Sequence, residues 1–532
     1  MPASFLQLWR LDLTGVAEAA HRWHALSQEL EHAHTQHQRQ VTGPLKKDGW
    51  TGEAADAAFG FMTGVENRLA IGRIEAETVH AVLDTVHQRM TRAHNDLRTT
   101  VREAESNGYS VDDDGTISPP RVHNRYEAAD QEPELAGYRQ RIAAALSAAE
   151  EASNEGRNAL AILHGDIMGQ YRPHAFNEAG TDAQSAMDVL GIGTPHPPKD
   201  PDAAAKWWHG LSPDQQRDYT LFYPQLIGST DGLPATVRND ANRIWLDEQL
   251  DNPDFATGHD AGIATTTPID PRYGNLMSLK LALDSYDTAP PGRELYLLGF
   301  SAGGDGKAVV AMGDPDTATH VGVYVPGTGN TITSTAGGLK RIDLLQQAAG
   351  LAHPSGPVST VYWLGYNAPE MPSVADLGIA TTTRADNGAP AFRRFIQGTR
   401  AAQGPAHHHI TVIGHSYGST LVGSAAKGGH LGADDIVVVG SPGMEITNVT
   451  DLGMPADHVY AGASPHDPIV KWTSNLTLGP DPTTTDFGAN EITVAPGDHS
   501  SYFNQGTDGL LNMGRIIAGK TPTLLHAAQG PS

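Results

Sequence analysis

Two serines of this chain lie at the centre of Gly-x-Ser-x-Gly pentapeptides, a spacing that can build a nucleophile. One pentapeptide centres on Ser301 and the other on Ser416. The backbone of such a pentapeptide turns so sharply that only small residues fit two positions on either side of the serine, which then stands at a strand-to-helix elbow. A serine hydroxyl attacks a carbonyl only when a base takes its proton and oriented N–H groups stabilise the resulting oxyanion. The surrounding elements must therefore supply these groups.

The flanking sequence distinguishes the two serines. Ser416 follows the apolar run 411–414 and precedes the small-residue segment 419–427, which predict a buried strand and a closely packed helix. Ser301 is followed by Gly303-Gly-Asp-Gly306 and a second strand-like run, so we expect it in a β-hairpin turn. We predict that Ser416 is the nucleophile. The predicted elbow consists of Gly414, His415, Ser416, Tyr417 and Gly418.

Short apolar runs alternate with helical patterns from Leu295 onward. The predicted strands are 295–300, 307–313, 320–327, 359–365, 409–415, 435–441, 458–464 and 490–496, and the predicted helices are 336–350, 386–403, 416–427 and 507–518. Eight strands, the first two joined by a hairpin and the others by helical or long connections, are typical of an α/β-hydrolase sheet. The elbow then follows the fifth strand, as in that fold.

An acid and a histidine follow the last two predicted strands. Asp467 comes after the seventh strand and His499 after the eighth. The chain order Ser416, Asp467, His499 is the order of a catalytic triad in this fold, in which histidine acts as the base and the acid orients it. We predict these roles here. Alternative acids are Asp457, Asp481 and Asp486.

The oxyanion donors are expected from two backbone N–H groups. One belongs to Tyr417, directly after the nucleophile, and the other to the loop after the third strand. Because Gly327 and Gly329 would let the backbone approach the substrate, we assign the second donor to Thr328. The alternative is a glycine-rich turn that only closes the strand. Tyr366, after the fourth strand, is predicted to line the pocket.

The first 190 residues predict a separate, mainly helical domain. Three- and four-residue apolar spacing over about 11–105 indicates a helical hairpin that bends near 42–52, and third and fourth helical patterns extend from about Glu132 to Gln170. A proline-rich linker at 191–203 precedes the hydrolase domain, predicted at 204–525. Nothing in the residues of 254–290 decides whether that segment acts as a lid.

Composition excludes several classes of function. The net charge of −25 and the pI near 5.3 argue against nucleic acid and anionic membrane surfaces as partners. The absence of cysteine excludes disulfides and thiolate metal sites. His407-His-His409 lacks companion ligands, so we predict no metal and no organic cofactor. We expect neither a Sec signal peptide nor a membrane span, since the chain has no run of about 18 apolar residues.

Several motifs, taken in order, resemble an actinobacterial α/β-hydrolase family formerly called DUF1023. The similarity covers about 204–520 and implies a serine hydrolase with a triad while leaving its substrate open. The motifs are Leu-Leu-Gly-Phe-Ser301, Val-Pro-Gly-Thr-Gly329, Trp363-Leu-Gly-Tyr-Asn-Ala-Pro369, Gly-His-Ser-Tyr-Gly418, Val-Gly-Ser-Pro-Gly443 and Gly-Asp-His-Ser-Ser-Tyr502.

The N-terminal hairpin resembles WXG100-type hairpins associated with type VII secretion, because Trp50-Thr-Gly52 lies at its bend. Tyr126-Glu-Ala-Ala-Asp130 also fits the Tyr-x-x-x-Asp export pattern, as does Tyr109-Ser-Val-Asp-Asp113. The resemblance implies a helical partner for the hairpin. The alternative is a helical domain that packs on the hydrolase or mediates oligomerisation.

Together these features predict a carboxylic-ester hydrolase that forms an acyl-enzyme intermediate on Ser416. A small-molecule or lipid-like ester is the expected substrate. The alternatives are an acyltransferase and a type VII secretion-linked interaction protein whose hydrolase fold is a scaffold. We expect a cytoplasmic location or export by a type VII-like route; acyl chain length and oligomeric state are not indicated.

Overall fold

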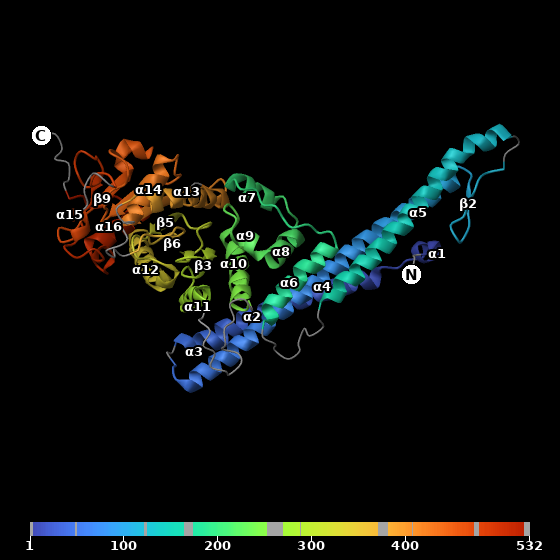
Figure 1. The fold of residues 1–532 in the computed structure, drawn as a ribbon, viewed down its shortest axis with the longest axis horizontal. Helices are drawn as coiled ribbons and strands as arrows, with labels where there is room; N and C mark the ends of the chain where they lie inside the picture. Colours follow the sequence, from blue (N-terminus) through green and yellow to red (C-terminus); the bar gives the residue numbers. More distant parts are fainter. Residues whose placement is uncertain are drawn as a thin grey trace. The chain divides into compact units, whose positions relative to one another are not determined.

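A helical region precedes an α/β-hydrolase domain in this chain (Figure 1). The computed structural model describes residues 4–47, 50–121, 125–163, 174–252, 270–287, 289–370, 381–406, 408–472 and 478–525. The chain divides into two compact units. One contains residues 1–42 and 51–194, and the other contains 43–50 and 195–532. The division at 194/195 lies within the proline-rich segment.

Long helices build the first unit. The predicted hairpin is formed by α2 and α4, which pack along each other, and α4 also packs along α5. A two-stranded antiparallel ribbon, β1–β2, lies between α4 and α5 along the chain. The elements are α1 (Phe5–Trp9), α2 (Thr14–His37), the π-helical turn η1 (Gln38–Thr42), α4 (Glu53–Ser106), β1 (Ser110–Val111), β2 (Ile117–Ser118), α5 (Arg125–Ile162) and α6 (Ala175–Val189); α3 (Gly43–Lys47) belongs to the second unit.

The prediction of two helices between Glu132 and Gln170 was wrong in its detail. A single helix, α5, already begins at Arg125 and continues to Ile162, while residues 164–173 lie outside the described part of the chain. The reason is composition: the middle of α5 is rich in alanine, the strongest helix former. No proline or glycine interrupts it between Gly137 and Gly156.

Five helices precede the sheet of the second unit after residue 200, and four of them have a clear start signal. Asp200 and Ser212 cap two of them by accepting hydrogen bonds from the backbone N–H groups of Ala203 and Gln215. Proline occupies the first turn of α7, α8, α9 and α11, where its missing N–H costs nothing. These helices are α7 (Pro201–His209), α8 (Pro213–Phe222), α9 (Pro224–Gly228), α10 (Ala235–Leu250) and α11 (Pro271–Asp284). Residues 254–269 and 288 of the segment 254–290 lie outside the described part of the chain.

The central sheet has eight strands in the order β10-β9-β8-β7-β5-β6-β4-β3. Only the β3–β4 and β4–β6 pairs are antiparallel. This mixed sheet confirms the predicted fold class. Its strands are β3 (Leu295–Ser301), β4 (Lys307–Met312), β5 (His320–Val325), β6 (Val358–Leu364), β7 (His409–His415), β8 (Asp435–Val439), β9 (Val459–Gly462) and β10 (Asn490–Glu491).

The last strand is shorter than predicted. Residues 490–496 were expected to form it, but β10 pairs with β9 only through Asn490 and Glu491. Ile492 then forms an isolated antiparallel bridge with Leu524. Pro496, which has no N–H to donate to a ladder, precedes the loop that carries His499.

Two pairs of helices cover the sheet on opposite faces (Figure 1). The Thr411 hydroxyl in β7 donates to the Ile516 carbonyl of α16, whereas a Cβ on Gly414 would meet Ser419 of α14. Residues three apart on a strand point to opposite faces. One pair is α12 (Thr335–Ala352) with α16 (Asp508–Ile517), and the other is α13 (Thr383–Gln403) with α14 (Tyr417–Lys427).

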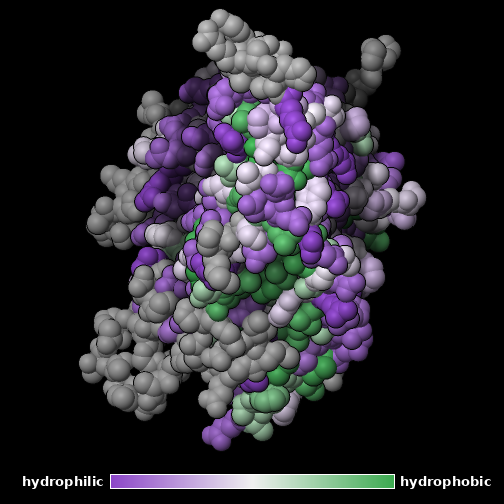
Figure 2. All heavy atoms as spheres, turned by 90° about the vertical axis from the view of Figure 1, so that its right-hand side faces the viewer, coloured by the Kyte–Doolittle hydropathy of each residue, from purple (hydrophilic) through white to green (hydrophobic). Residues whose placement is uncertain are grey.

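Within the described residues, no helix combines the length and apolar character needed to cross a membrane. Figure 2 shows one face of the molecule, on which hydrophilic residues surround a band of hydrophobic ones. The many hydrophilic residues on this face agree with a chain whose net charge is −25.

Candidate active site

Ser416 occupies a strained elbow between β7 and α14. Its φ of 55° and ψ of −133° fall in a region that residues other than glycine rarely adopt. The flanking glycines make the turn possible, since a Cβ on Gly418 would stand 2.3 Å from the Val325 carbonyl oxygen and one on Gly414 would stand 2.7 Å from the Ser419 Cα. The Gly-x-Ser-x-Gly spacing is thus a steric requirement of this turn.

Ser301 lies in a different setting, as predicted. It is the last residue of β3 and pairs with Lys307 of β4 in the antiparallel hairpin. No strand-to-helix elbow forms there.

The glycine-rich loop after β5 approaches the elbow closely. A Cβ on Gly327 would lie 2.6 Å from the Ser416 Cβ and 2.8 Å from the Tyr417 nitrogen. Neither the Tyr417 N–H nor the Thr328 N–H donates a hydrogen bond to any described residue. Both proposed oxyanion donors are therefore available to bind a ligand.

Side chains hold this loop in place. The Asn330 amide donates to the carbonyl oxygens of Gly327 and Thr328, at 2.8 and 3.3 Å. The buried Tyr366 hydroxyl donates to the Pro326 carbonyl at 2.7 Å. Tyr366 thus supports the loop from the core, and its predicted contribution to a pocket wall stays a prediction.

Asp467 and His499 meet across the loops that follow β9 and β10. The Asp467 Oδ2 lies 2.8 Å from the His499 Nδ1, and the Asp467 side chain is fully buried while that of His499 is 26% exposed. An ionised carboxylate can only accept, so Nδ1 carries the proton and Nε2 carries the lone pair. This is the tautomer that a general base requires.

Further donors surround the Asp467 carboxylate. The Tyr502 hydroxyl donates to Oδ2 at 2.7 Å, and the Ile469 N–H donates to Oδ1 at 2.9 Å. Burial opposes the charged form, but the hydrogen bonds from His499 and Tyr502 outweigh it and keep the pKa of Asp467 below its ordinary value. The carboxylate is therefore ionised at neutral pH.

His415, the residue before Ser416, connects the elbow to the histidine loop. Its Nε2 lies 2.8 Å from the His499 carbonyl oxygen, and the two rings are 4.8 Å apart between centroids. Burial, followed by the neighbouring His499, lowers the pKa of His415 to about 3. A neutral His415 thus donates from Nε2 and fixes the backbone of His499 beside the elbow.

The structure brings Ser416, His415 and the Asp467–His499 pair to the same edge of the sheet. Asp481 instead accepts hydrogen bonds from Thr483, and Asp457 is exposed in a short 3₁₀ turn. His499 Nδ1 bonds to Asp467 and not to these rival acids or Asp486. The catalytic roles themselves remain proposals.

Sequence reasoning missed three contributors to this arrangement: Tyr502, Gly440 and the bridging function of His415. Gly440 has a φ of +57°, and a Cβ there would lie 3.0 Å from the Asp467 Oδ2 and 3.2 Å from the His499 Cε1. Gly440 belongs to the motif Val-Gly-Ser-Pro-Gly443, and Tyr502 ends the motif Gly-Asp-His-Ser-Ser-Tyr502. Membership of these motifs is the only sequence signal that could have indicated a role for either residue. Their contacts come from segments distant in the sequence.

His409, the first residue of β7, places its Nε2 atom 2.8 Å from the Asp435 Oδ2 of β8. His407 lies outside the described residues.

Residues 302–477 match the family model described as alpha/beta hydrolase. This range contains Ser416 and Asp467 and ends before His499. An uncharacterized protein of Mycobacterium tuberculosis, Rv2079, is 30% identical over 365 residues, which are 59% of this chain and 55% of that protein. The uncharacterized protein Mb0988c of Mycobacterium bovis is 34% identical over 182 residues, which are 32% of this chain and 66% of that protein.

The chain thus covers little more than half of the first of these relatives. The match and the sheet establish an alpha/beta hydrolase domain. Neither relative's description supplies a substrate, and neither supports the resemblance of the N-terminal hairpin to WXG100 proteins.

Proposed function

We propose that this protein is a serine hydrolase that cleaves carboxylic esters with Ser416, His499 and Asp467. The observation that carries the proposal is the Asp467–His499 hydrogen bond of 2.8 Å, held by His415 next to a strained serine elbow. An aspartate–histidine pair that only stabilised the fold would not require a strained Ser416 backbone nearby. A strained turn at Ser416 would likewise not require the Asp467–His499 pair. Their coincidence at the carboxyl edge of an alpha/beta hydrolase sheet favours catalysis.

In the proposed reaction His499 Nε2 removes the Ser416 proton as Oγ attacks the ester carbonyl. Asp467 stabilises the imidazolium without taking its proton. The imidazolium then protonates the leaving alkoxide, which leaves an acyl group on Ser416. Water, deprotonated by His499, then attacks this acyl-enzyme. As the second tetrahedral intermediate collapses, the imidazolium returns the proton to Ser416 Oγ and the carboxylic acid departs.

The negative charge of each tetrahedral intermediate needs donors at the elbow. The Tyr417 N–H at the start of α14 is positioned for this, because a helix N-terminus favours anions. We assign the second donor to Thr328 on the loop supported by Asn330. Among the described residues, Ser416 and His499 are not hydrogen-bonded to each other. In enzymes of this kind the bond between nucleophile and base often forms fully only when substrate is bound.

Esters are favoured over amides because an alkoxide leaves more easily than an amine, an argument that rests partly on the chemistry common in this fold. The direct test is intact-mass spectrometry after treatment with a fluorophosphonate probe. We expect wild type and Ser301→Ala to gain one probe mass and Ser416→Ala to gain none. Labelling that survives in Ser416→Ala, or disappears in Ser301→Ala, would contradict the assignment.

A second role, partner binding by the N-terminal hairpin, is favoured by exposed apolar side chains on it. Phe61 is 68% exposed and Val41 is 42% exposed. We propose that this surface contacts a helical partner, as would suit type VII export. Analytical ultracentrifugation of wild type and of Phe61→Ser, each mixed with the same candidate helical partner, tests this proposal. Equal binding of the partner by both proteins would oppose it.

A further inference from the structure

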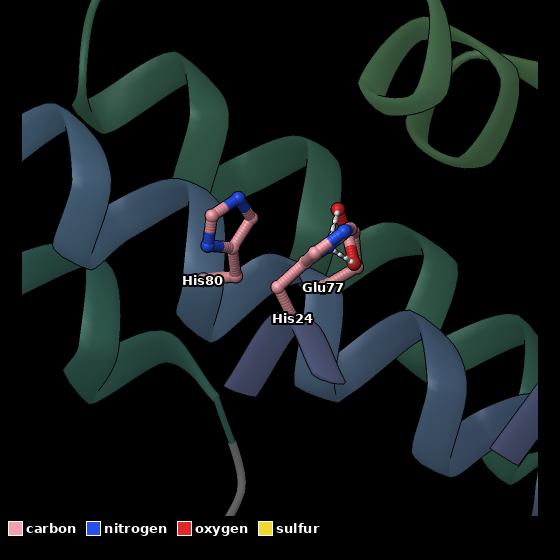
Figure 3. Close-up of side chains that lie close together, drawn as sticks. All are labelled: His24, Glu77 and His80. Atoms are coloured by element: carbon pink, nitrogen blue, oxygen red, sulfur yellow. Dashed lines mark hydrogen bonds and ion pairs between the residues drawn. The ribbon is translucent and has the colours of Figure 1, made fainter. Parts of the chain in front are cut away.

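Two histidines and a glutamate meet where α2 and α4 pack together (Figure 3). His24 comes from α2, whereas Glu77 and His80 are three residues apart on α4 and so share one face of that helix. One potential ligand atom from each residue lies within 4.8 Å of the other two. Within the described residues this is the one three-ligand group of histidine and acidic side chains.

The group is enclosed by the helical unit. The Glu77 side chain is fully buried, that of His24 is 20% exposed, and His80 is 8% exposed. Burying a carboxylate is costly unless charge or hydrogen bonds compensate for it. His24 Nδ1 already lies within hydrogen-bond distance of this carboxylate, and a bound cation would add further compensation.

The spacing of the donor atoms suits a small divalent ion. His24 Nδ1 lies 3.2 Å from both Oε1 and Oε2 of Glu77. Two ligand atoms that each lie about 2.0–2.1 Å from one tetrahedral zinc ion are roughly 3.4 Å apart. Figure 3 shows His24 and Glu77 pointing toward each other with the His80 ring beside them. The two histidine rings are 4.9 Å apart between centroids.

Outer hydrogen bonds orient the imidazoles as metal ligands require. His80 Nδ1 lies 3.0 Å from the Ala20 carbonyl oxygen, which can only accept, so His80 Nε2 carries the lone pair. Metal-binding histidines commonly donate their other ring N–H to a carbonyl in this way. His24 Nε2 faces the Gln28 amide at 2.8 Å, and rotating that amide puts its oxygen there to accept the Nε2 proton. His24 Nδ1 is then free to bind the ion.

We propose that His24, Glu77 and His80 bind one divalent transition-metal ion that links α2 to α4. Two imidazoles and one carboxylate suit zinc and its neighbours better than calcium or magnesium, which prefer all-oxygen sites. No metal was predicted from the sequence, and this proposal departs from that prediction because of the Glu77-x-x-His80 spacing on α4 and the approach of His24. The site plays no part in the proposed ester chemistry.

The hairpin also offers a matched control. His37 Nδ1 lies 3.0 Å from the Glu66 Oε1, and Thr42 donates to the same oxygen at 2.6 Å. This is a histidine–glutamate pair between the same helical segments, but without a second histidine. It represents the alternative in which such pairs are only hydrogen-bonded packing.

The test uses the full chain, stripped with a chelator and titrated with zinc chloride alone. Bound zinc is measured by mass spectrometry of the metal after gel filtration, and the thermal midpoint is measured with and without zinc. We expect about one zinc per chain and a raised midpoint for wild type, for the matched control His37→Gln, and for His408→Gln, which alters the separate histidine tract 407–409. We expect at least a tenfold weaker affinity and no zinc-dependent midpoint shift for His80→Gln.

Glu77→Gln keeps the size of the side chain while removing a ligand, so it serves if His80→Gln fails to fold, as judged by circular dichroism. Titration with cobalt(II) adds an absorption spectrum that reports nitrogen and oxygen ligands. A zinc content of wild type of about 0.1 per chain or less after gel filtration would overturn the proposal. So would binding that survives in both ligand variants or that is lost in His408→Gln.

Discussion

Gly327 lies so close to Ser416 that a Cβ atom on the glycine would stand 2.6 Å from the Cβ of the serine. Gly327→Ala must therefore displace either the loop or the elbow. We expect kcat on an ester such as p-nitrophenyl acetate to fall roughly 100- to 1,000-fold, the cost of losing an oxyanion donor. Gly337→Ala is the control, because nothing lies within 4 Å of a Cβ there. Equal activity of the two variants would contradict the role of the loop.

Asp467→Asn is expected to reduce kcat by about 10⁴-fold, because the amide can donate to His499 Nδ1 and so favours the wrong tautomer. Steady-state ester hydrolysis measures the effect. The same change at the rival acid Asp481, whose side chain bonds to Thr483, should leave kcat near the wild-type value. A larger loss in Asp481→Asn would transfer the orienting role to that residue.

Tyr502→Phe removes one hydrogen bond to the Asp467 Oδ2 and leaves the bonds from His499 and Ile469. A hydrogen bond to a charged group contributes about 1.5–3 kcal/mol, so kcat should fall roughly 10- to 100-fold if most of this acts in the transition state. Steady-state ester hydrolysis measures the loss. Tyr460→Phe, which removes a hydroxyl from strand β9, is the control, and an unchanged kcat in Tyr502→Phe would argue for a purely structural tyrosine.

His415→Gln is expected to change how stability depends on pH. Burial and His499 lower the pKa of His415 to about 3 in the folded chain, whereas an unfolded histidine titrates near 6.5. The unfolded state therefore binds the extra proton between these values, and wild type loses up to about 1.4 kcal/mol per pH unit as the pH falls below 6.5. Glutamine can still donate to the His499 carbonyl but does not titrate.

Urea unfolding of both proteins between pH 4 and 8 tests this expectation. The difference between their pH slopes isolates His415, because groups such as His320 titrate in both. The free energy of unfolding should decline more steeply in wild type below pH 6.5 and run parallel above it. Parallel curves throughout would mean that His415 is not buried in its neutral form.

Local sequence patterns predicted most of the strands and helices of the hydrolase domain. Strand β7 and helix α14 were predicted within one residue, since an apolar run, two glycines around Ser416 and a small-residue helix are local signals. Strand β10 was overestimated because its pairing ends where Pro496 and the bridge to Leu524 take over. The start of α5 at Arg125, seven residues before the predicted Glu132, was missed for a similar reason: periodicity locates helices better than it locates their ends.

Short-range sterics and periodic apolar residues encode the elbow, the order of Ser416, Asp467 and His499, and the hairpin of α2 and α4, so these features could be predicted from the chain alone. The groups that surround those residues became apparent only in the folded protein. Tyr502 on Asp467, His415 on His499, and His24 beside Glu77 and His80 are contacts between segments 35, 84 and 53 or more positions apart. Such contacts depend on how the packed sheet and helices bring distant loops and faces together, which no local spacing specifies.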